Sequence, residues 1–571
     1  MAGGLLNLTA TGSANVILTG NPTKTFFKVV YSKYTNFGLQ KFRLDYEGLR
    51  DLRLTTSSTF QFKVKRYADL LMDTYLCVTL PDIFSPIYQP CKENSYKWAS
   101  YDFRWIRDLG THMIENITIT CGSMLLQSYS GAYLAAMIQR DFPENKKHAF
   151  NRMSGNTAEY YDPANAYGRN NAYPSSFYAG DGVNAEPSIR GSTIYIPINA
   201  WFMLDSRCAF PLVALQYNEL IINVTIRPIQ ELFQVRDVFD WGNHFPYVQP
   251  DFTLSQFAMY RYLQQAPGVN LETSQYQNQT TTWNADVHLL ATYCFLSEEE
   301  RKKIALEDQV YLVKDVFEYK FDNVVGSNTV TLTSNGMIAN WMWHLQRNDV
   351  NMRNEWSNYS NWPYREPPND IFPAPTVVSI VNGEPYPVLA YPLVPTEDYL
   401  YPTGPGTHPP SFGQVVGSNT GYYVTGAFSQ DNIQDIMVSM GINLNGVYRE
   451  NVLPAEVFDY VDQYARSNGS GKRGLYCYSF GLNTSPFEYQ PSGAMNLSRF
   501  KDINLEITTI TPVISTQNSN YQVICDTTGN PIGISKQNWR LFDYTFNMTL
   551  YEERYNVLSI IGGNAGMLFA R

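Results

Sequence analysis

The sequence predicts an all-β protein built from two β-sandwiches, one in each half of the chain. Short segments of alternating apolar and polar residues recur throughout, which is the pattern of strands with one buried face. Turns rich in Gly, Pro and Asn separate these segments. A chain of 571 residues fits two sandwiches of roughly 200–250 residues or more at least as well as four small domains.

The alternating segments are found in both halves of the chain. Two of them, 222–226 (INVTI) and 503–507 (INLEI), are alike and suggest a duplicated sandwich. The clearest segments are 60–64, 117–120, 222–226, 330–333, 503–507 and 542–550.

Helical patterns are few and short. One covers 131–140 (GAYLAAMIQR) and another covers 297–309 (SEEERKKIALEDQ). In the second, Ser297 stands at the N-cap with Glu300 three residues later, which predicts a capping box.

Two long stretches interrupt the strands, at about 145–190 and about 348–419. Both are rich in Pro, Gly, Asn and aromatic residues. Loops of this length are functional or disordered in compact domains, and their aromatic content argues against disorder. We expect ordered surface loops at comparable places in the two halves, with residues 228–284 as a connector between the halves.

The charge balance does not favour nucleic-acid binding. Only 16% of the residues are charged, against about a quarter in an average domain, and the formal net charge is −10. The basic clusters are short, and we interpret each as a solvated face: Lys146–His148, Arg301–Lys303 and Lys472–Arg473. Aromatic residues make up 15% of the chain, which fits either large protein contacts or simply large β-sandwiches.

Cysteine spacing and hydropathy set further limits. The seven cysteines are widely spread without a CxxC pair, so we expect buried free thiols rather than a disulfide framework or a zinc site. No apolar run reaches 18 residues, so no membrane-spanning segment is expected. Residues 1–20 lack the charged and apolar regions of a secretory signal, and we expect none.

A search for catalytic chemistry finds no supported site. HExxH, GxSxG and GxGxxG are absent, and the six histidines show no metal-ligand spacing. Residues 469–474 (GSGKRG) resemble part of a phosphate-binding loop, but Arg473 stands where Ser or Thr should follow the lysine. We interpret this segment as a flexible hairpin tip, and we expect no catalytic residue, no cofactor and no metal site.

Several long segments resemble the major capsid proteins of nucleocytoplasmic large DNA viruses, and most closely those of the mimivirus-like branch. The segments are spread in the family's order over nearly the whole chain, which makes chance agreement untenable. They are 1–36, 66–81, 105–134, 194–226, 286–318, 490–500 and 555–570.

The resemblance implies a double jelly roll. By this resemblance, residues 1–24 would form an N-terminal segment on the inner side of the shell and residues 25–227 the first jelly roll. Residues 228–284 would be the connector, and residues 285–571 would form the second jelly roll. The long loops would form outer towers. Arg66, Ser498 and Arg499, within the family-like segments, are expected to serve packing and hydrogen bonding inside the sandwiches.

The resemblance also implies the partners. Three chains would form a pseudo-hexagonal capsomer, and capsomers would tile an icosahedral shell together with minor capsid and penton proteins. The protein would be assembled in the host cytoplasm and found in the virion, where the shell can overlie an internal membrane. Two alternatives share the fold: a receptor- or glycan-binding surface protein, and a transient assembly scaffold.

Overall fold

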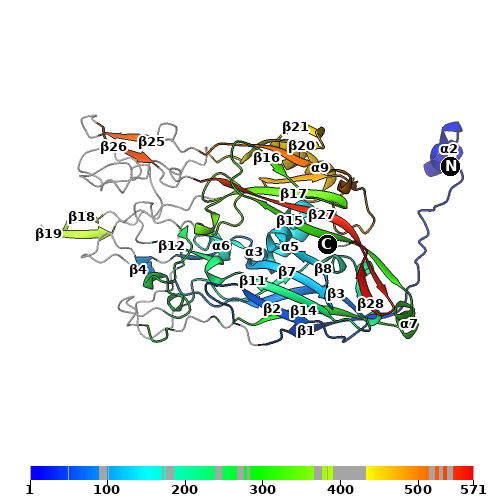
Figure 1. The fold of residues 1–571 in the computed structure, drawn as a ribbon, viewed down its shortest axis with the longest axis horizontal. Coiled ribbons are helices and arrows are strands. Elements are labelled where there is room, and N and C mark those ends of the chain that lie inside the picture. Colours follow the sequence, from blue (N-terminus) through cyan, green and yellow to red (C-terminus); the bar gives the residue numbers. More distant parts are fainter. Residues whose placement is uncertain are drawn as a thin grey trace.

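The structure is a computed structural model in which two β-sandwiches lie side by side (Figure 1). The two sandwiches share a long interface, and the N-terminus lies away from both of them at the end of an extended segment (Figure 1). The described residues are 2–48, 51–85, 87–88, 99–100, 102–169, 173–174, 176, 186–237, 247–265, 276–279, 283, 285–365, 376–381, 384–389, 433–512, 521–525, 531–536 and 544–569.

The first sandwich has a five-stranded sheet ordered β1-β14-β3-β10, with β9 also on β3, and a four-stranded sheet ordered β2-β11-β7-β8. Neighbouring strands are antiparallel. The strands are β1 (Phe37–Asp45), β2 (Ser58–Lys63), β3 (Leu70–Thr79), β7 (Ile114–Cys121), β8 (Met124–Tyr129), β9 (Thr193–Pro197), β10 (Phe210–Pro211), β11 (Leu220–Ile226) and β14 (Val287–Leu296).

The second sandwich has a six-stranded sheet ordered β15-β27-β17-β22, with β23 on β17 and β28 on β27, and a four-stranded sheet ordered β16-β24-β20-β21. The strands are β15 (Gln309–Phe321), β16 (Ser327–Thr331), β17 (Met337–Arg347), β20 (Met437–Leu444), β21 (Val447–Pro454), β22 (Leu475–Ser479), β23 (Met495–Asn496), β24 (Ile503–Thr509), β27 (Phe546–Ile561) and β28 (Asn564–Met567).

The two sandwiches have the same strand order. With the main strands of each numbered in chain order, one sheet reads first–eighth–third–sixth and the other second–seventh–fourth–fifth, with β9 and β10 sharing the sixth place in the first sandwich. This is the order of a jelly roll, so the predicted fold class of two tandem jelly rolls is confirmed. The seventh strands, β11 and β24, bury every second residue in the same pattern. The two segments that look alike in the sequence are therefore equivalent strands.

The eighth strand of the first jelly roll, β14, lies beyond residue 284. It runs between β1 and β3, with Leu289 opposite Leu76. Residues 228–284 therefore connect the seventh and eighth strands of the first jelly roll. We propose that the boundary between the two jelly rolls follows Leu296 rather than residue 284.

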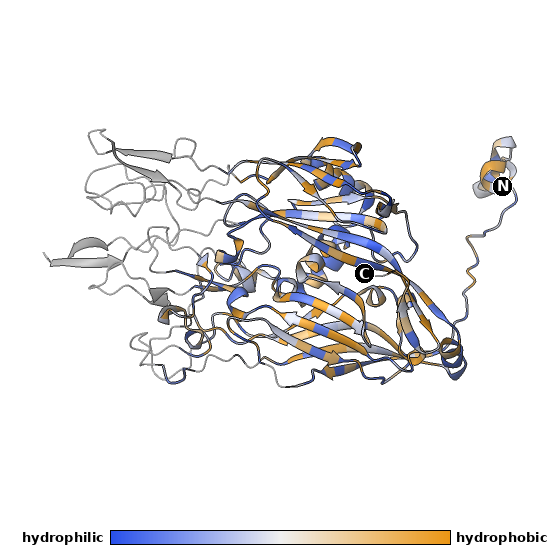
Figure 2. Ribbon diagram, viewed as in Figure 1, coloured by the Kyte–Doolittle hydropathy of each residue, from blue (hydrophilic) through white to orange (hydrophobic). Residues whose placement is uncertain are grey.

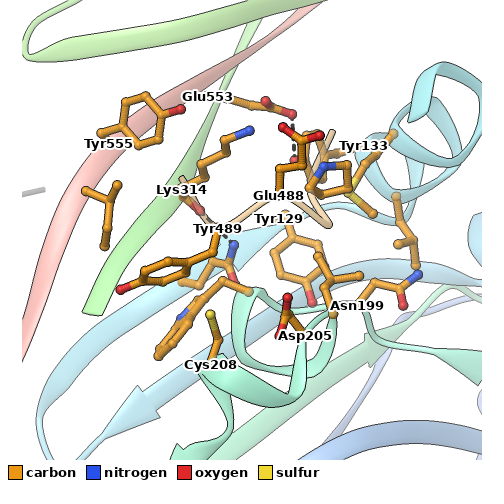
Figure 3. A pocket seen from close by; sticks show the side chains of 17 residues that line it. Tyr129, Tyr133, Asn199, Asp205, Cys208, Lys314, Glu488, Tyr489, Glu553 and Tyr555 are labelled. Carbon is orange, nitrogen blue, oxygen red and sulfur yellow. Dashed lines mark hydrogen bonds between the residues drawn. The ribbon is translucent and has the colours of Figure 1, made fainter. Parts of the chain in front are cut away.

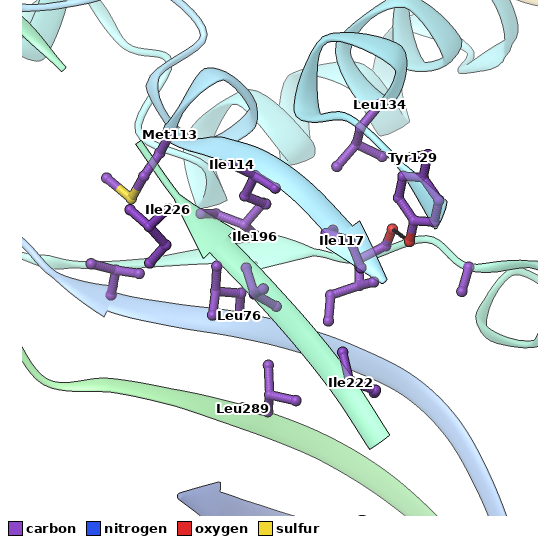
Figure 4. Packing of buried hydrophobic residues seen from close by; sticks show 14 of the residues in the cluster. Leu76, Met113, Ile114, Ile117, Tyr129, Leu134, Ile196, Ile222, Ile226 and Leu289 are labelled. Atoms are coloured by element: carbon purple, nitrogen blue, oxygen red, sulfur yellow. Dashed lines mark hydrogen bonds between the residues drawn. The ribbon is translucent and has the colours of Figure 1, made fainter. Parts of the chain in front are cut away.

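Alternation along the strands produces the two cores. In the first, side chains from both sheets meet, among them Leu76, Ile117, Ile222 and Leu289 (Figure 4), all fully buried. Burying one such side chain contributes about 1.5–3 kcal/mol. The second core is built around Trp341, Trp343 and Leu505. Figure 2 shows hydrophobic and hydrophilic residues alternating along these strands.

Two helices form where the sequence predicts them. Helix α4 (Gly131–Asp141) starts at Ser130, whose hydroxyl accepts a hydrogen bond from the Tyr133 N–H. Helix α7 (Glu298–Leu306) follows Ser297, but the Ser297 side chain makes no capping hydrogen bond, so the predicted capping box is wrong.

Asp69, which directly precedes β3, anchors the start of α7 instead. It accepts a hydrogen bond from the Leu296 N–H and pairs with Arg301 at 2.8 Å. The anchor comes from a residue more than 200 positions away in the sequence, which local patterns cannot show.

The stretch 145–190 is partly helical, contrary to the prediction of a loop. Helix α5 (Glu144–Met153) buries Phe150 and Lys147, and the short helix α6 (Ala158–Tyr161) follows it. Four of the ten residues of α5 are charged, so the sequence shows too few apolar residues for its helical pattern to be recognised.

The two long stretches do not occupy comparable places, because 145–190 joins the fifth and sixth strands of its jelly roll whereas 348–419 joins the third and fourth. Only part of the second stretch is described, including the paired strands β18 (Thr376–Val381) and β19 (Glu384–Leu389). Residues 390–419 lie outside the described residues.

Residues 2–36, here called the arm, extend away from the first jelly roll (Figure 1). They include the short helices α1 (Leu6–Thr9) and α2 (Val16–Thr19), and every residue except Asn15 is exposed. The opposite end of the molecule carries the β18–β19 hairpin and the hairpin of β25 (Tyr521–Cys525) and β26 (Pro531–Lys536) (Figure 1).

Five cysteines are buried free thiols, as predicted: Cys77, Cys121, Cys208, Cys294 and Cys477. Within the described residues, no helix is both long and apolar enough to cross a membrane.

Candidate functional site

Two clusters of buried charged residues lie in the interface between the two jelly rolls. The first cluster includes a residue of the segment 469–474, which the sequence suggested to be a flexible hairpin tip. That prediction is wrong, because the segment packs on α4 of the first jelly roll. The Gly469 N–H donates to the Arg140 carbonyl at 2.8 Å and the Gly471 N–H donates to the Gln139 carbonyl at 3.0 Å. A Cβ at residue 469 would lie 2.4 Å from the Arg140 carbonyl oxygen, so only glycine allows this approach.

This close approach places Lys472 inside the interface, where its side chain is only 7% exposed. Its Nζ lies 3.9 Å from Asp108 Oδ2 and 4.2 Å from the centre of the Tyr359 ring. His344 of β17 stacks on the same ring at 4.3 Å. The interpretation of Lys472 as part of a solvated face is therefore wrong.

Asp108 precedes the short helix α3 (Leu109–Met113) and collects hydrogen bonds from both jelly rolls. Its Oδ2 accepts from the Ser357 hydroxyl at 2.6 Å, and its Oδ1 accepts from Asn156 Nδ2 at 2.6 Å. The Ser357 hydroxyl also lies 3.2 Å from His112 Nε2. The carboxylate therefore links α3 to chain segments on both sides of the interface.

Burial sets the protonation of this cluster. It lowers the pKa of His112 and of His344 to about 3, so both are neutral imidazoles. Burial also lowers the pKa of Lys472 to about 7, against the attraction of Asp108. Burial alone would raise the pKa of Asp108, but Lys472 and the Ser357 hydrogen bond hold it below its usual value.

A second buried cluster lies between α4 and β27. The Arg140 guanidinium donates to Asp141 Oδ2 and to Glu553 Oε1, both at 2.7 Å. Arg140, Asp141 and Glu553 are each at most 2% exposed. Glu553 belongs to the second jelly roll and Arg140 to the first, so this charge pair connects them.

Further hydrogen bonds satisfy the two carboxylates. Glu553 Oε1 accepts from the Tyr133 hydroxyl, and Glu553 Oε2 accepts from Asn340 Nδ2, both at 2.9 Å. Asp141 Oδ1 accepts from the Thr484 hydroxyl at 2.6 Å. Burial opposes the charge of Glu553, but Arg140 and nearby Lys314 hold its pKa below the usual value. A buried carboxylate with this many partners is stable only when both jelly rolls are in place.

A cavity of about 70 Å³ opens beside this cluster (Figure 3). Lys314 of β15 and Glu553 of β27 line one side, and Asn199, Asp205 and Cys208 line the other. Its walls mix tyrosines with these polar groups, which suits ordered water.

The arrangement does not favour catalysis. Ser357, His112 and Asp108 are the residue types of a hydrolytic triad, but Ser357 donates directly to the aspartate instead of to the histidine. All three lie inside the interface, with Ser357 and His112 at 3% and 2% exposed. A triad needs an aspartate that orients the histidine and a serine that reaches the substrate. Among the described residues, no group of three His, Cys, Asp or Glu could hold a metal ion.

The other residues singled out in the sequence have structural roles. Arg66 donates to the Asn218 carbonyl at 2.9 Å, and the Ser498 hydroxyl accepts from the Gly336 N–H at 2.7 Å. Arg499 is exposed. Lys147, interpreted as solvated, is buried and donates to the Ser470 hydroxyl.

Comparison with known proteins agrees with this architecture. The VP54 protein of PBCV-1 superimposes with a TM-score of 0.56 at 18% identity, covering 96% of this chain and all of VP54. The fold is that of the double jelly-roll capsid proteins. Two family models match consecutive parts of the chain: "Major capsid protein N-terminus" over residues 25–296 and "Large eukaryotic DNA virus major capsid protein" over residues 300–566.

Together the two models cover nearly the whole chain, and the chain belongs to the family of major capsid proteins of large eukaryotic DNA viruses. The major capsid protein of Phaeocystis pouchetii virus is 25% identical over 604 aligned residues, covering all of both chains. Capsid protein 1 of Acanthamoeba polyphaga mimivirus is 27% identical over 318 residues, which is 55% of this chain and 44% of that relative. The resemblance predicted from the sequence is confirmed.

Proposed function

We propose that three copies of this chain associate into a pseudo-hexagonal capsomer and that many capsomers tile an icosahedral shell. The observation that carries the proposal is the doubled jelly roll with one strand order in both halves. A trimer then presents six similar sandwiches, so an object with three-fold symmetry can fill a six-sided tile.

The interface between the jelly rolls supports this role. A tile must keep its two sandwiches in one relative position, or its edges will not match those of its neighbours. The Arg140–Glu553 pair and the Lys472 cluster join the sandwiches through buried charges that must stay paired. The chain is in this view a rigid building block without catalytic activity, cofactor or metal.

The two ends of the molecule suggest its orientation. The arm leaves one end, and the hairpins β18–β19 and β25–β26 lie at the other (Figure 1). We place the arm on the inner side of the shell and the hairpins with the long loops on the outer side. Minor capsid and penton proteins are the expected further partners, nucleic acid is not, and assembly takes place in the host cytoplasm.

Electron microscopy and particle composition test the proposal. Negative-stain images of the purified protein should show hexagonal outlines with three protrusions. Mass spectrometry of purified virions should find this chain among the most abundant proteins. Trace abundance would favour a transient scaffold, and a glycan array with specific binding would favour a receptor-binding protein.

A further inference from the structure

The arm exposes an unusual amount of apolar surface. Val29 and Val30 are 90% and 82% exposed, and Phe26, Phe27 and Tyr31 are exposed to a similar degree. The hydrogen bonds that the structure describes within the arm join arm residues to each other. An exposed apolar segment of this size marks a contact surface.

Residues 26–34 (FFKVVYSKY) have the composition of a strand. Aromatic and β-branched residues make up most of the segment, and such residues favour sheets. The segment runs directly into β1 but has no strand partner among the described residues. Its charge is one-sided, since the arm carries Lys24, Lys28 and Lys33 and no acidic residue.

The second jelly roll offers a matching surface at the free edge of its four-stranded sheet. Strand β21 pairs with β20 on one side, and the described residues place no strand on the other. Exposed apolar side chains on β21 and on the helical segment that follows it, residues 457–466, are together called the β21 patch. They are between 45% and 93% exposed: Val447, Tyr448 and Val452 on the strand, and Tyr460, Val461 and Tyr464 on the helical segment. An exposed apolar edge strand is a template for pairing with another chain.

The charge of this surface is opposite to that of the arm. Residues 447–466 contain four acids, and with Asp459 buried, Glu450, Glu456 and Asp462 remain against the two arginines Arg449 and Arg466, a formal charge of −1 for the residues that are not buried. Opposite charges on two apolar surfaces select the correct partner and speed its approach.

We propose that residues 26–34 of one copy add as a strand to the β21 edge of a neighbouring copy and cover its β21 patch. Addition of an extended segment to a sheet edge satisfies the unpaired backbone groups of both partners. A neighbouring copy is the expected acceptor because the arm leaves the molecule at β1, on the opposite side from β21 (Figure 1). The inference rests on the proposed assembly of the chain, which supplies the neighbours.

Photo-crosslinking in the full-length protein tests the contact. A benzophenone amino acid in place of Val30 should give, on irradiation, a product of two chains on a denaturing gel. Mass spectrometry of this product should join the arm to residues 447–466. Val452→Lys in the same chain should reduce the yield by about tenfold, because a charge replaces a valine that the proposed contact covers. The matched control Val310→Lys, at a site 60% exposed on β15, should leave the yield unchanged.

Light scattering on the same samples separates the two proposals. A trimer whose crosslinks join the arm to any other surface overturns the arm contact and leaves the capsomer standing. A trimer that crosslinks only to lipid when vesicles containing phosphatidylserine are added also overturns the arm contact and leaves the capsomer standing. A monomer without crosslinks overturns both.

Discussion

Replacing Arg140 by methionine tests whether buried charge holds the two jelly rolls together. The substitution keeps most of the side-chain volume but leaves Asp141 and Glu553 without their buried counter-ion. Breaking one side of a buried pair costs about 3–5 kcal/mol. With an unfolding entropy of about 2.1 cal/mol/K per residue and a unit of roughly 270 residues, the melting midpoint should fall by about 5–9 °C.

Differential scanning fluorimetry measures this shift. Arg190→Met is the matched control, since the Arg190–Glu186 pair is 76% and 84% exposed and should contribute little. The double variant Arg140→Met with Glu553→Gln should recover part of the loss, because one of the stranded charges is removed. A midpoint for Arg140→Met within about 1 °C of the unmodified protein, outside the range expected for breaking a buried pair, would refute the reasoning.

Three further predictions follow from the same structure. His112 and His344 stay neutral in the folded protein and are protonated only in the unfolded chain as pH falls from about 6.5 to about 3, so stability should fall through this window. His344→Phe, which keeps the stacking on Tyr359, should flatten the plot of melting midpoint against pH, and an unchanged slope would contradict the assignment. Gly469→Ala should lower the midpoint because the new Cβ would meet the Arg140 carbonyl, whereas Gly12→Ala, with open space around it, should not. Ile222→Ala should cost about 2–5 kcal/mol by opening a cavity in the first core, measured by urea unfolding, and a loss below about 1 kcal/mol would contradict the packing.

Local patterns were enough to predict the sandwiches. Strands β11 and β24 alternate strictly because one face of each is buried, so their sequences show both the element and its equivalent place in the two halves. Helix α4 was found for a similar reason, since its apolar residues and its Ser130 cap lie within one short segment.

The interface could not be predicted in this way. Lys472 looks like a surface residue in the sequence, and its burial depends on Asp108, which is more than 350 positions away. The same holds for Arg140 and Glu553. Strand β14 shows no sign in its own residues of pairing with β1, so the sequence predicts a boundary before this strand, whereas we propose that the boundary follows it.

The mass of the purified protein in solution tests the central claim most directly. Multi-angle light scattering should give a single species near three times the chain mass of 65.1 kDa, stable on dilution. A single species at 65.1 kDa under the same conditions would contradict the assignment of this chain as the unit of a trimeric capsomer.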